Sequence, residues 1–293
     1  MSKIALLSQE TIDKIAAGEV VERPSSVVKE LVENAIDAGA SAITVEIKEG
    51  GISLIRITDN GCGIPKEEVP LAFLRHSTSK IRSAEDLMCV HSLGFRGEAL
   101  SSIAAVSRVE MITKPADALT GTRYVIEGSK EIADEEIGAP DGTTFLVRDL
   151  FYNTPARRKF LKTAQTEGTY ISDMLEKLAL SHPDISFKYI NNNQTRLHTS
   201  GNGKKRDLIY HIYGREIAAA LLEVNYKGEY FSLSGYIGKP VINRGNRNYE
   251  NYFINGRYIK SSLLSRSIEE AYHNFLMQHQ YPFCVLYFEM NSE

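Results

Sequence analysis

Glu30 and Asn34 stand four residues apart in a segment of helical periodicity, so both side chains would lie on one face of an α-helix. A carboxylate in that position can polarise a water molecule as a general base. A carboxamide oxygen beside it can bind Mg²⁺, which takes few protein ligands and leaves other positions to phosphates and water. Asp59 and Gly63 follow in the motif D-N-G-C-G, where the carboxylate can accept a hydrogen bond from the exocyclic amine of adenine and the glycine admits close approach of a base. These residue types and spacings predict a site for Mg²⁺ and ATP.

A glycine-rich segment before a second predicted helix supplies groups that bind phosphates. Its residues are Gly94, Phe95, Arg96, Gly97, Glu98, Ala99 and Leu100, and apolar residues at helical spacing continue to Val106. Backbone N–H groups and the helix dipole favour phosphate at such a start, and glycines allow a lid to close. Thr78, Ser79 and Lys80 add two hydroxyl groups and a cation, and Thr143 at the start of a strand can line the base pocket. No G-x-x-x-x-G-K-[ST] motif occurs, which excludes a P-loop mechanism, and no G-x-G-x-x-G motif follows a predicted strand, so a dinucleotide-binding fold has no support.

The helix that carries Glu30 and Asn34 is predicted to begin at Pro24, a favourable first-turn residue, and to end at Gly39. Its apolar stripe consists of Val27, Val28, Leu31, Val32, Ala35 and Ile36. On a helical wheel Glu30 and Asn34 fall along one edge of this stripe, where a pocket can form. Glu33 falls on the opposite side, and we expect it to be solvated.

The remaining pattern predicts an α+β fold with two domains, residues 1–200 and residues 201–293, separated at a small, polar and charged segment. In the first domain we expect strands at 43–47, 52–58, 108–113, 122–127 and 143–148, helices at 9–17, 154–161 and 166–180, and a hairpin of 185–190 with 195–199. In the second we expect helices at 207–212 and 261–277 and strands at 221–226, 230–237, 249–254 and 283–289. Asp59 would thus be positioned by the end of a strand.

Composition limits the class of protein. Hydrophobic residues make up 43% and charged residues 24% of the 293 residues, which is ordinary for a soluble globular protein. Three widely spaced cysteines give neither metal-ligand spacing nor a disulfide framework, and no signal-peptide core or run of 18 apolar residues occurs, so we expect a cytoplasmic protein without a membrane segment. Residues 1–150 hold 16 Lys+Arg against 24 Asp+Glu, whereas residues 151–293 hold 18 against 13, so a polyanion would be bound mainly by the second half.

These motifs together resemble the Bergerat-type (GHKL) ATPases, the superfamily of gyrase B, a heat-shock chaperone, histidine kinases and MutL. The strings G-E-V-V-E-R-P, K-E-L-V-E-N, D-A-G-A, G-F-R-G-E-A-L and F-Y-N-T-P-A-R-R-K-F, in this order, are similar to those of the MutL mismatch-repair proteins. The resemblance implies an α/β sandwich, a mixed sheet with helices on one face, followed by a smaller β-α-β domain like the transducer domain of gyrase B.

The resemblance also implies roles for residues. Glu30 would activate the attacking water, Asn34 would hold Mg²⁺, Asp59 would read adenine and Thr143 would border the base. The segments around Lys80 and Arg96 would wrap the phosphates. ATP binding would order the lid and drive formation of a homodimer, so that slow hydrolysis times a switch on DNA. Mismatch-recognition and downstream repair proteins would be its protein partners.

Non-specific DNA contact through phosphates is expected from cations near the domain junction and in the second domain. The candidates are Arg157, Arg158, Arg257, Lys260 and Arg266. In MutL proteins a lysine that reaches the γ-phosphate lies beyond the segment at which this chain stops, so we expect an N-terminal fragment that also lacks the C-terminal dimerisation region.

Two other functions fit the same pocket. A non-catalytic, nucleotide-responsive module that binds DNA or acts as a scaffold would have no need of Glu30 as a base. A phosphotransferase like the histidine kinases would need a helical hairpin with a phosphoacceptor histidine, and the pattern shows none.

Overall fold

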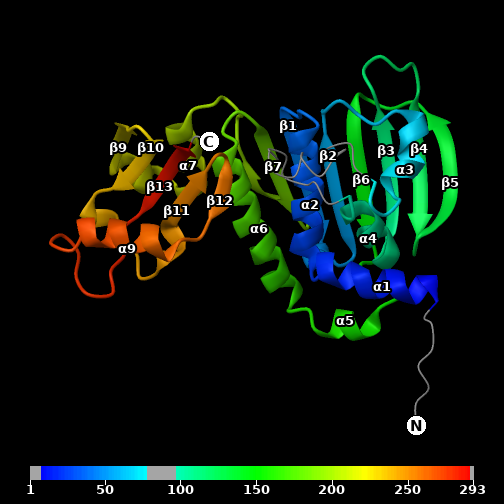
Figure 1. Ribbon diagram of the computed structural model, residues 1–293, viewed down its shortest axis with the longest axis horizontal. Coiled ribbons are helices and arrows are strands. Elements are labelled where there is room, and N and C mark those ends of the chain that lie inside the picture. The colour runs from blue at the N-terminus through cyan, green and yellow to red at the C-terminus, as the bar shows by residue number, and fades with distance from the viewer. Residues whose placement is uncertain (1–7, 78–96, 291–293) are drawn as a thin grey trace, which may run out of the picture. The chain divides into compact units, whose positions relative to one another are not determined.

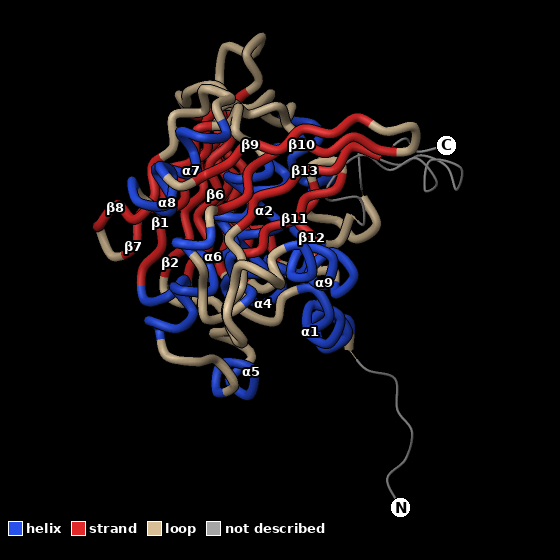
Figure 2. The backbone as a smooth tube through the Cα atoms, turned by 90° about the vertical axis from the view of Figure 1, so that its left-hand side faces the viewer, coloured by secondary structure: helices blue, strands red, loops and turns tan. Residues whose placement is uncertain are grey.

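The computed structural model describes residues 8–77 and 97–290. The chain divides into two compact units, each with its own sheet (Figures 1 and 2). The first unit comprises the chain up to Leu175 together with Ser186–His198, and the second comprises Glu176–Ile185 together with the chain from Thr199. The chain passes into the second unit for the last time at Thr199, and the sequence prediction placed the domain boundary after residue 200.

The sheet of the first unit has eight strands in the order β5-β4-β3-β6-β2-β1-β7-β8. The strands are β1 (Ala42–Lys48), β2 (Leu54–Asp59), β3 (Arg108–Lys114), β4 (Gly121–Glu127), β5 (Lys130–Ile137), β6 (Gly142–Arg148), β7 (Ser186–Asn191) and β8 (Gln194–His198). All neighbours pair antiparallel except β1 and β7, which are parallel, so the sheet is mixed. Seven of the eight strands overlap a strand that the sequence pattern predicted, and β5 was not predicted.

Helices cover one face of this sheet (Figure 1). The covering helices are α1 (Gln9–Val20), α2 (Pro24–Asp37), α3 (Val69–Ala72), α4 (Ala99–Val106) and α6 (Ala164–Ser181), and the short α5 (Pro155–Lys159) precedes α6 in the chain. Helix α2 packs on β1 and β2, α4 packs on β3 and β4, and α1 packs on α4. The Tyr189 hydroxyl of β7 donates to the carbonyl oxygen of Gly168 at 3.2 Å, which holds α6 on the same sheet. The predicted mixed sheet with helices on one face is confirmed.

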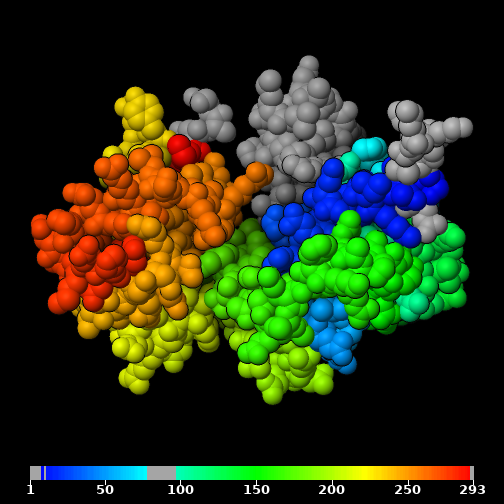
Figure 3. Space-filling view, turned by 90° about the horizontal axis from the view of Figure 1, so that it is seen from below, coloured from blue at the N-terminus to red at the C-terminus, as the bar shows by residue number. Residues whose placement is uncertain are grey.

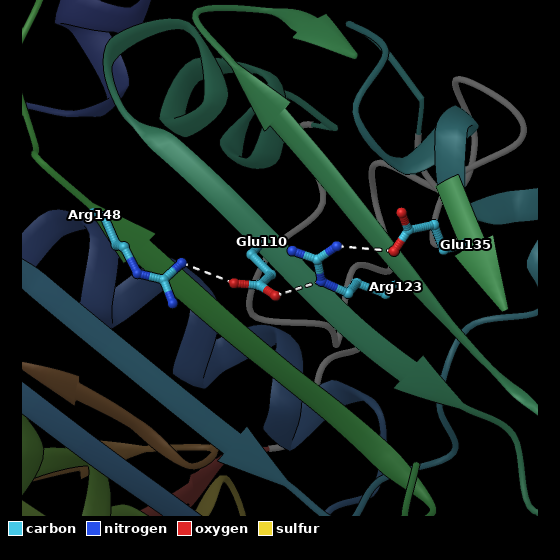
Figure 4. A network of polar contacts seen from close by, with 4 residues as sticks. All are labelled: Glu110, Arg123, Glu135 and Arg148. Carbon is cyan, nitrogen blue, oxygen red and sulfur yellow. Dashed lines mark hydrogen bonds and ion pairs between the residues drawn. The ribbon is translucent and has the colours of Figure 1, made fainter. Parts of the chain in front are cut away.

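Alternation along the strands explains why only one face is covered. In β2 Ile55 and Ile57 are fully buried, whereas Arg56 between them is exposed. The other face of the sheet instead carries paired charges (Figure 4). Glu110 accepts hydrogen bonds from Arg123 at 2.7 Å and Arg148 at 2.8 Å, and Arg123 also donates to Glu135 at 2.9 Å. This network satisfies the charges on β3, β4, β5 and β6 without a covering layer.

The second unit is a smaller five-stranded sheet in the order β12-β11-β13-β10-β9 (Figure 2). Its strands are β9 (Leu221–Lys227), β10 (Phe231–Gly238), β11 (Glu250–Ile254), β12 (Arg257–Ile259) and β13 (Cys284–Met290), and its helices are α7 (Lys205–Tyr213), α8 (Arg215–Ala219) and α9 (Ser262–Ala271). Strands β11 and β13 are parallel with α9 between them in the chain, which confirms the predicted β-α-β arrangement. Leu264 and Ile268 of α9 pack on the buried side chains of Tyr252, Cys284 and Leu286.

Helix α9 ends at Ala271, six residues before the predicted end, with Tyr272 as its C-cap. The Tyr272 hydroxyl donates to the carbonyl oxygen of Gly238, a contact with β10 that fixes this end of the helix. Within residues 8–77 and 97–290, none of the helices combines the length and the apolar character needed to cross a membrane.

Candidate functional site

Asp59 is buried at the end of β2, between β1 and β6. Its Oδ1 accepts hydrogen bonds from the backbone N–H groups of Gly61 at 2.8 Å and Thr143 at 3.3 Å. Desolvation raises the pKa of the Asp59 carboxyl group, although these two hydrogen bonds act in the opposite direction. Because both contacts from the described part of the chain go to Oδ1, Oδ2 is the oxygen left to accept from a ligand.

Two buried threonines fix the backbone around Asp59. The hydroxyl groups of Thr113 and Thr143 lie 2.9 Å apart, and Thr113 Oγ1 also accepts from the backbone N–H of Ile64 at 2.9 Å. The turn after β2 is therefore tied to β3 as well as to β6. Our sequence reasoning named Thr143 and missed Thr113. The available signal was a threonine at an inward position of the predicted strand 108–113, where an apolar residue is usual.

Glycines at this end of the sheet lie where no side chain fits. Gly63 has φ +71°, and a Cβ atom there would stand 2.4 Å from the carbonyl oxygen of Lys114. Gly142 has φ +105°, and its Cβ would stand 2.2 Å from the carbonyl oxygen of Asp59. The close approach of these backbones holds the Asp59 carboxylate at the end of the strand.

Helix α2 brings Glu30 and Asn34 toward the same end of the sheet. Both side chains are half-buried, as expected for the edge of the apolar stripe. The carbonyl oxygen of Asn34 accepts from Ala38 N–H at 2.9 Å, and the carbonyl oxygen of Ala38 accepts from Cys62 N–H at 3.0 Å. The last turn of α2 is thus hydrogen-bonded directly to the turn that follows Asp59.

Glu33 is buried, with an exposed fraction of 6%, so the expectation of a solvated side chain was wrong. Desolvation is the main cause that raises the pKa of its carboxyl group to about 6, and Lys29, with a nitrogen 3.5 Å away, opposes the shift. The helical-wheel prediction assumed that only the apolar stripe of α2 is buried, against one neighbouring surface. The helix contacts α4 as well as β1 and β2, so more of its circumference is covered than one stripe predicts.

Helix α4 begins at Ala99, with Glu98 as its N-cap and Gly97 before it. Gly97 has φ +63°, and a Cβ atom there would lie 2.6 Å from the carbonyl oxygen of Ser77. The predicted residues Gly97, Glu98, Ala99 and Leu100 therefore lie at the start of a helix that packs against α2. Thr78, Ser79, Lys80, Gly94, Phe95 and Arg96 lie outside the described residues.

The predicted DNA-contacting residues occur in both units. Arg158 is exposed on α5, and Arg257, Lys260 and Arg266 are exposed in the second unit. Arg157 is half-buried: its Nη2 donates to the carbonyl oxygen of Lys14 at 3.2 Å, and its guanidinium carbon lies 5.7 Å from the ring centroid of Phe151. This contact gives Arg157 a structural role that the sequence did not indicate.

Comparisons with known proteins agree with this geometry. Residues 19–148 match the family of histidine kinase-, DNA gyrase B- and HSP90-like ATPases, and residues 209–293 match the C-terminal domain family of DNA mismatch repair proteins. The DNA mismatch repair protein MutL of Agathobacter rectalis is 79% identical over the whole chain, and that of Thermoanaerobacter pseudethanolicus is 49% identical over 99% of it.

A solved structure, the Aquifex aeolicus MutL ATPase domain complexed with ADP, is similar with a TM-score of 0.72 and 28% identity, covering 94% of each chain. The present chain spans 45% and 47% of the two MutL sequences, so it corresponds to about half of their length. The matches, the site and the fold together show that this chain belongs to the MutL family of DNA mismatch repair proteins and contains the ATPase domain of that family.

Proposed function

We propose that this chain binds ATP with Mg²⁺ and hydrolyses it slowly, and that the nucleotide state controls contact with DNA and with a second copy of the chain. The observation that carries the proposal is the buried Asp59, whose Oδ1 is held by Gly61 and Thr143 while Oδ2 is left to accept from an adenine amine. A buried carboxylate held in this way discriminates between bases, because a ligand without the donor leaves the oxygen without a partner.

The other residues take roles around that anchor. Thr143 would border the base, and backbone N–H groups at the start of α4, from Gly97 to Leu100, would bind phosphates. Asn34 would hold Mg²⁺, which when bound offsets the negative charge of the phosphates. Among the residues that the structure describes, no three His, Cys, Asp or Glu side chains gather to hold a metal, so the phosphates would supply the remaining ligands.

Glu30 is the proposed general base. It lies one turn before Asn34 on a helix whose end is hydrogen-bonded to the Asp59 turn, so base and metal ligand share one rigid element. The segments 78–80 and 94–96 are proposed to complete the phosphate site. We further propose that residues 1–200 act as the ATP-binding domain and residues 201–293 as a transducer-like domain, in the cytoplasm.

The test compares Glu30→Ala with Glu22→Ala, a change of an exposed glutamate near the start of the same helix. Glu30→Ala should retain ATP binding by calorimetry and lose hydrolysis by roughly 10²- to 10⁴-fold, the usual contribution of a general base. Glu22→Ala should hydrolyse ATP at the original rate. Retained turnover in Glu30→Ala would remove Glu30 as the base, and ATP binding without any turnover in the unaltered chain would favour a non-catalytic scaffold.

Dimer formation is tested separately by light scattering with a non-hydrolysable ATP analogue and Mg²⁺. We expect a monomer without nucleotide and a dimer with it, because ordering of the phosphate-binding segments would create the surface between copies. A mass that stays monomeric at saturating analogue would contradict nucleotide-controlled dimerisation by this chain while leaving the hydrolysis result intact.

A further inference from the structure

Phe160 is one of the most exposed large apolar side chains of the first unit, with an exposed fraction of 83%. It is the C-cap residue of α5. Three exposed cations, Arg158, Lys159 and Lys162, surround it in the chain. An exposed aromatic ring next to cations in the chain can bind a ligand that has both a flat apolar face and negative charge.

The segment before Phe160 is held firmly. Helix α5 lies beside α1 (Figures 1 and 3), and Arg157 joins the two through its hydrogen bond to the carbonyl oxygen of Lys14. The guanidinium group fills the space beside Gly18, where a Cβ atom would lie 2.3 Å from Nη2. Phe160 N–H in turn donates to the carbonyl oxygen of Arg157 at 3.0 Å. The backbone of the exposed aromatic residue is therefore fixed through Arg157.

The segment after Phe160 is fixed by a buried carboxylate. Glu167 of α6 is fully buried, and its Oε1 accepts from the backbone N–H of Lys162 at 2.9 Å. Burial of a carboxylate is costly unless it is hydrogen-bonded, so this contact holds Lys162 in one place. Residues 158–162 thus form a short projection that is anchored at both ends, and little conformational entropy is lost when a ligand binds to it.

We propose that Phe160 stacks on an unpaired base of single-stranded nucleic acid while Arg158, Lys159 and Lys162 neutralise the adjoining phosphates. This inference rests on the DNA-binding part of the proposed function and names a site for it. In a duplex both faces of each base are already stacked, whereas an unpaired base offers its π-face to an aromatic ring. A protein partner is disfavoured, since charged residues are depleted at the centre of protein interfaces and here three exposed cations lie within two residues of Phe160 in the chain.

The first test measures affinity for a short oligothymidine by fluorescence anisotropy over a range of salt concentrations. Phe160→Ala should bind roughly 5- to 150-fold more weakly with an unchanged salt dependence, because stacking involves no counterion. Arg158→Gln should reduce the slope of log K against log salt by about 0.7, the contribution of one phosphate contact on a single strand. Leu119→Ala, at a 99% exposed leucine between β3 and β4, is the matched control and should bind like the original chain.

The second test observes the ring directly. The chain contains no tryptophan, so Phe160→Trp introduces a single tryptophan, which can be excited selectively over the tyrosines. Oligothymidine should quench its emission, and the same sequence in a duplex should quench it less at equal occupancy. Phe160→Tyr, which keeps a flat ring, should restore the affinity that Phe160→Ala loses.

Equal oligothymidine affinity in Phe160→Ala and the original chain would overturn the proposal, as would unchanged tryptophan emission at saturation. Binding to anionic lipid vesicles with none to oligothymidine would also overturn it. If salt-dependent DNA binding persists without a contribution from Phe160, only this stacking site fails and the proposed function stands. Absence of ATP hydrolysis would contradict the proposed function while leaving the stacking result valid.

Discussion

Two glycines with almost the same backbone conformation allow the effect of close packing at the Asp59 turn to be separated from the effect of backbone strain. Gly63 has φ +71° and Gly39, at the end of α2, has φ +73°. A Cβ atom on Gly63 would stand 2.4 Å from the carbonyl oxygen of Lys114, whereas a Cβ atom on Gly39 would meet nothing within 4 Å. Alanine at either position therefore carries the same conformational strain, and only Gly63→Ala adds a steric clash.

The strain of alanine in the left-handed region costs ~1–2 kcal/mol, and the restricted unfolded chain offsets ~0.4–1 kcal/mol of it. Gly39→Ala should thus lower the free energy of unfolding by roughly 0–1.6 kcal/mol. In Gly63→Ala the backbone of Lys114 must also move by about 1 Å, and forced shifts of packed groups cost a further ~1–3 kcal/mol. The difference in free energy of unfolding between the two variants is therefore the cost of the steric clash at position 63.

Urea unfolding followed by circular dichroism gives both free energies, and calorimetry gives the affinity for ATP. We expect Gly63→Ala to be the less stable variant and to bind ATP roughly tenfold or more weakly, since its turn can relax only by moving away from β3. Gly39→Ala should keep its ATP affinity. Equal destabilisation of the two variants, or unaltered ATP binding in Gly63→Ala, would refute the steric reasoning.

Three further predictions concern side chains. Asp59→Asn keeps Oδ1 but replaces Oδ2 with a donor, so ATP affinity measured by calorimetry should fall roughly 5- to 150-fold with little change in stability, and an unchanged affinity would exclude Asp59 as the adenine acceptor. Glu250 is buried and desolvation raises its pKa above the ordinary 4.5, so the folded state holds this proton more tightly and stability should fall as the pH rises from 4.5 through the folded pKa. In Glu250→Gln the free energy of unfolding should no longer decrease over this pH range. Urea unfolding at several pH values measures the stability of Glu250→Gln relative to the original chain, and a relative stability that does not increase with pH would contradict this prediction. Glu110→Gln should lower the free energy of unfolding by about 1–2 kcal/mol at low salt and by less at high salt. Desolvation raises the pKa of Glu110, but the hydrogen bonds from Arg123 and Arg148 outweigh it and lower the pKa. Both ion pairs are partly exposed to solvent, so salt screens them.

The elements that carry the candidate site could be predicted from local pattern. Pro24 and Gly39 mark the ends of α2 within two residues, and the alternation before Asp59 places it at the end of β2. The parallel pairing of β1 with β7 joins segments that are far apart in the chain, and single-sequence periodicity holds no information on such partners.

The features that sequence reasoning missed depend on tertiary contacts. Strand β5 is rich in acidic residues, which disfavour strands, and it forms at an exposed edge because Arg123 and Lys66 pair with its carboxylates at 2.9 and 2.6 Å. Glu33 is buried although a helical wheel of α2 alone leaves it in solvent, because α2 contacts α4 as well as the sheet and burial depends on such neighbours. The roles proposed for Glu30, Asn34 and the segments around Lys80 and Arg96 stay predictions.

The parallel pairing of β1 with β7 has a consequence for folding during synthesis. Until the ribosome has released residues 186–198, β1 is an edge strand with unpaired N–H and C=O groups and a fully apolar alternate face, which can template aggregation. A fragment cut to residues 19–148, the range that matches the ATPase family, would keep Glu30, Asn34, Asp59 and Thr143 but leave that edge open permanently. A minimal soluble nucleotide-binding fragment should therefore extend through His198.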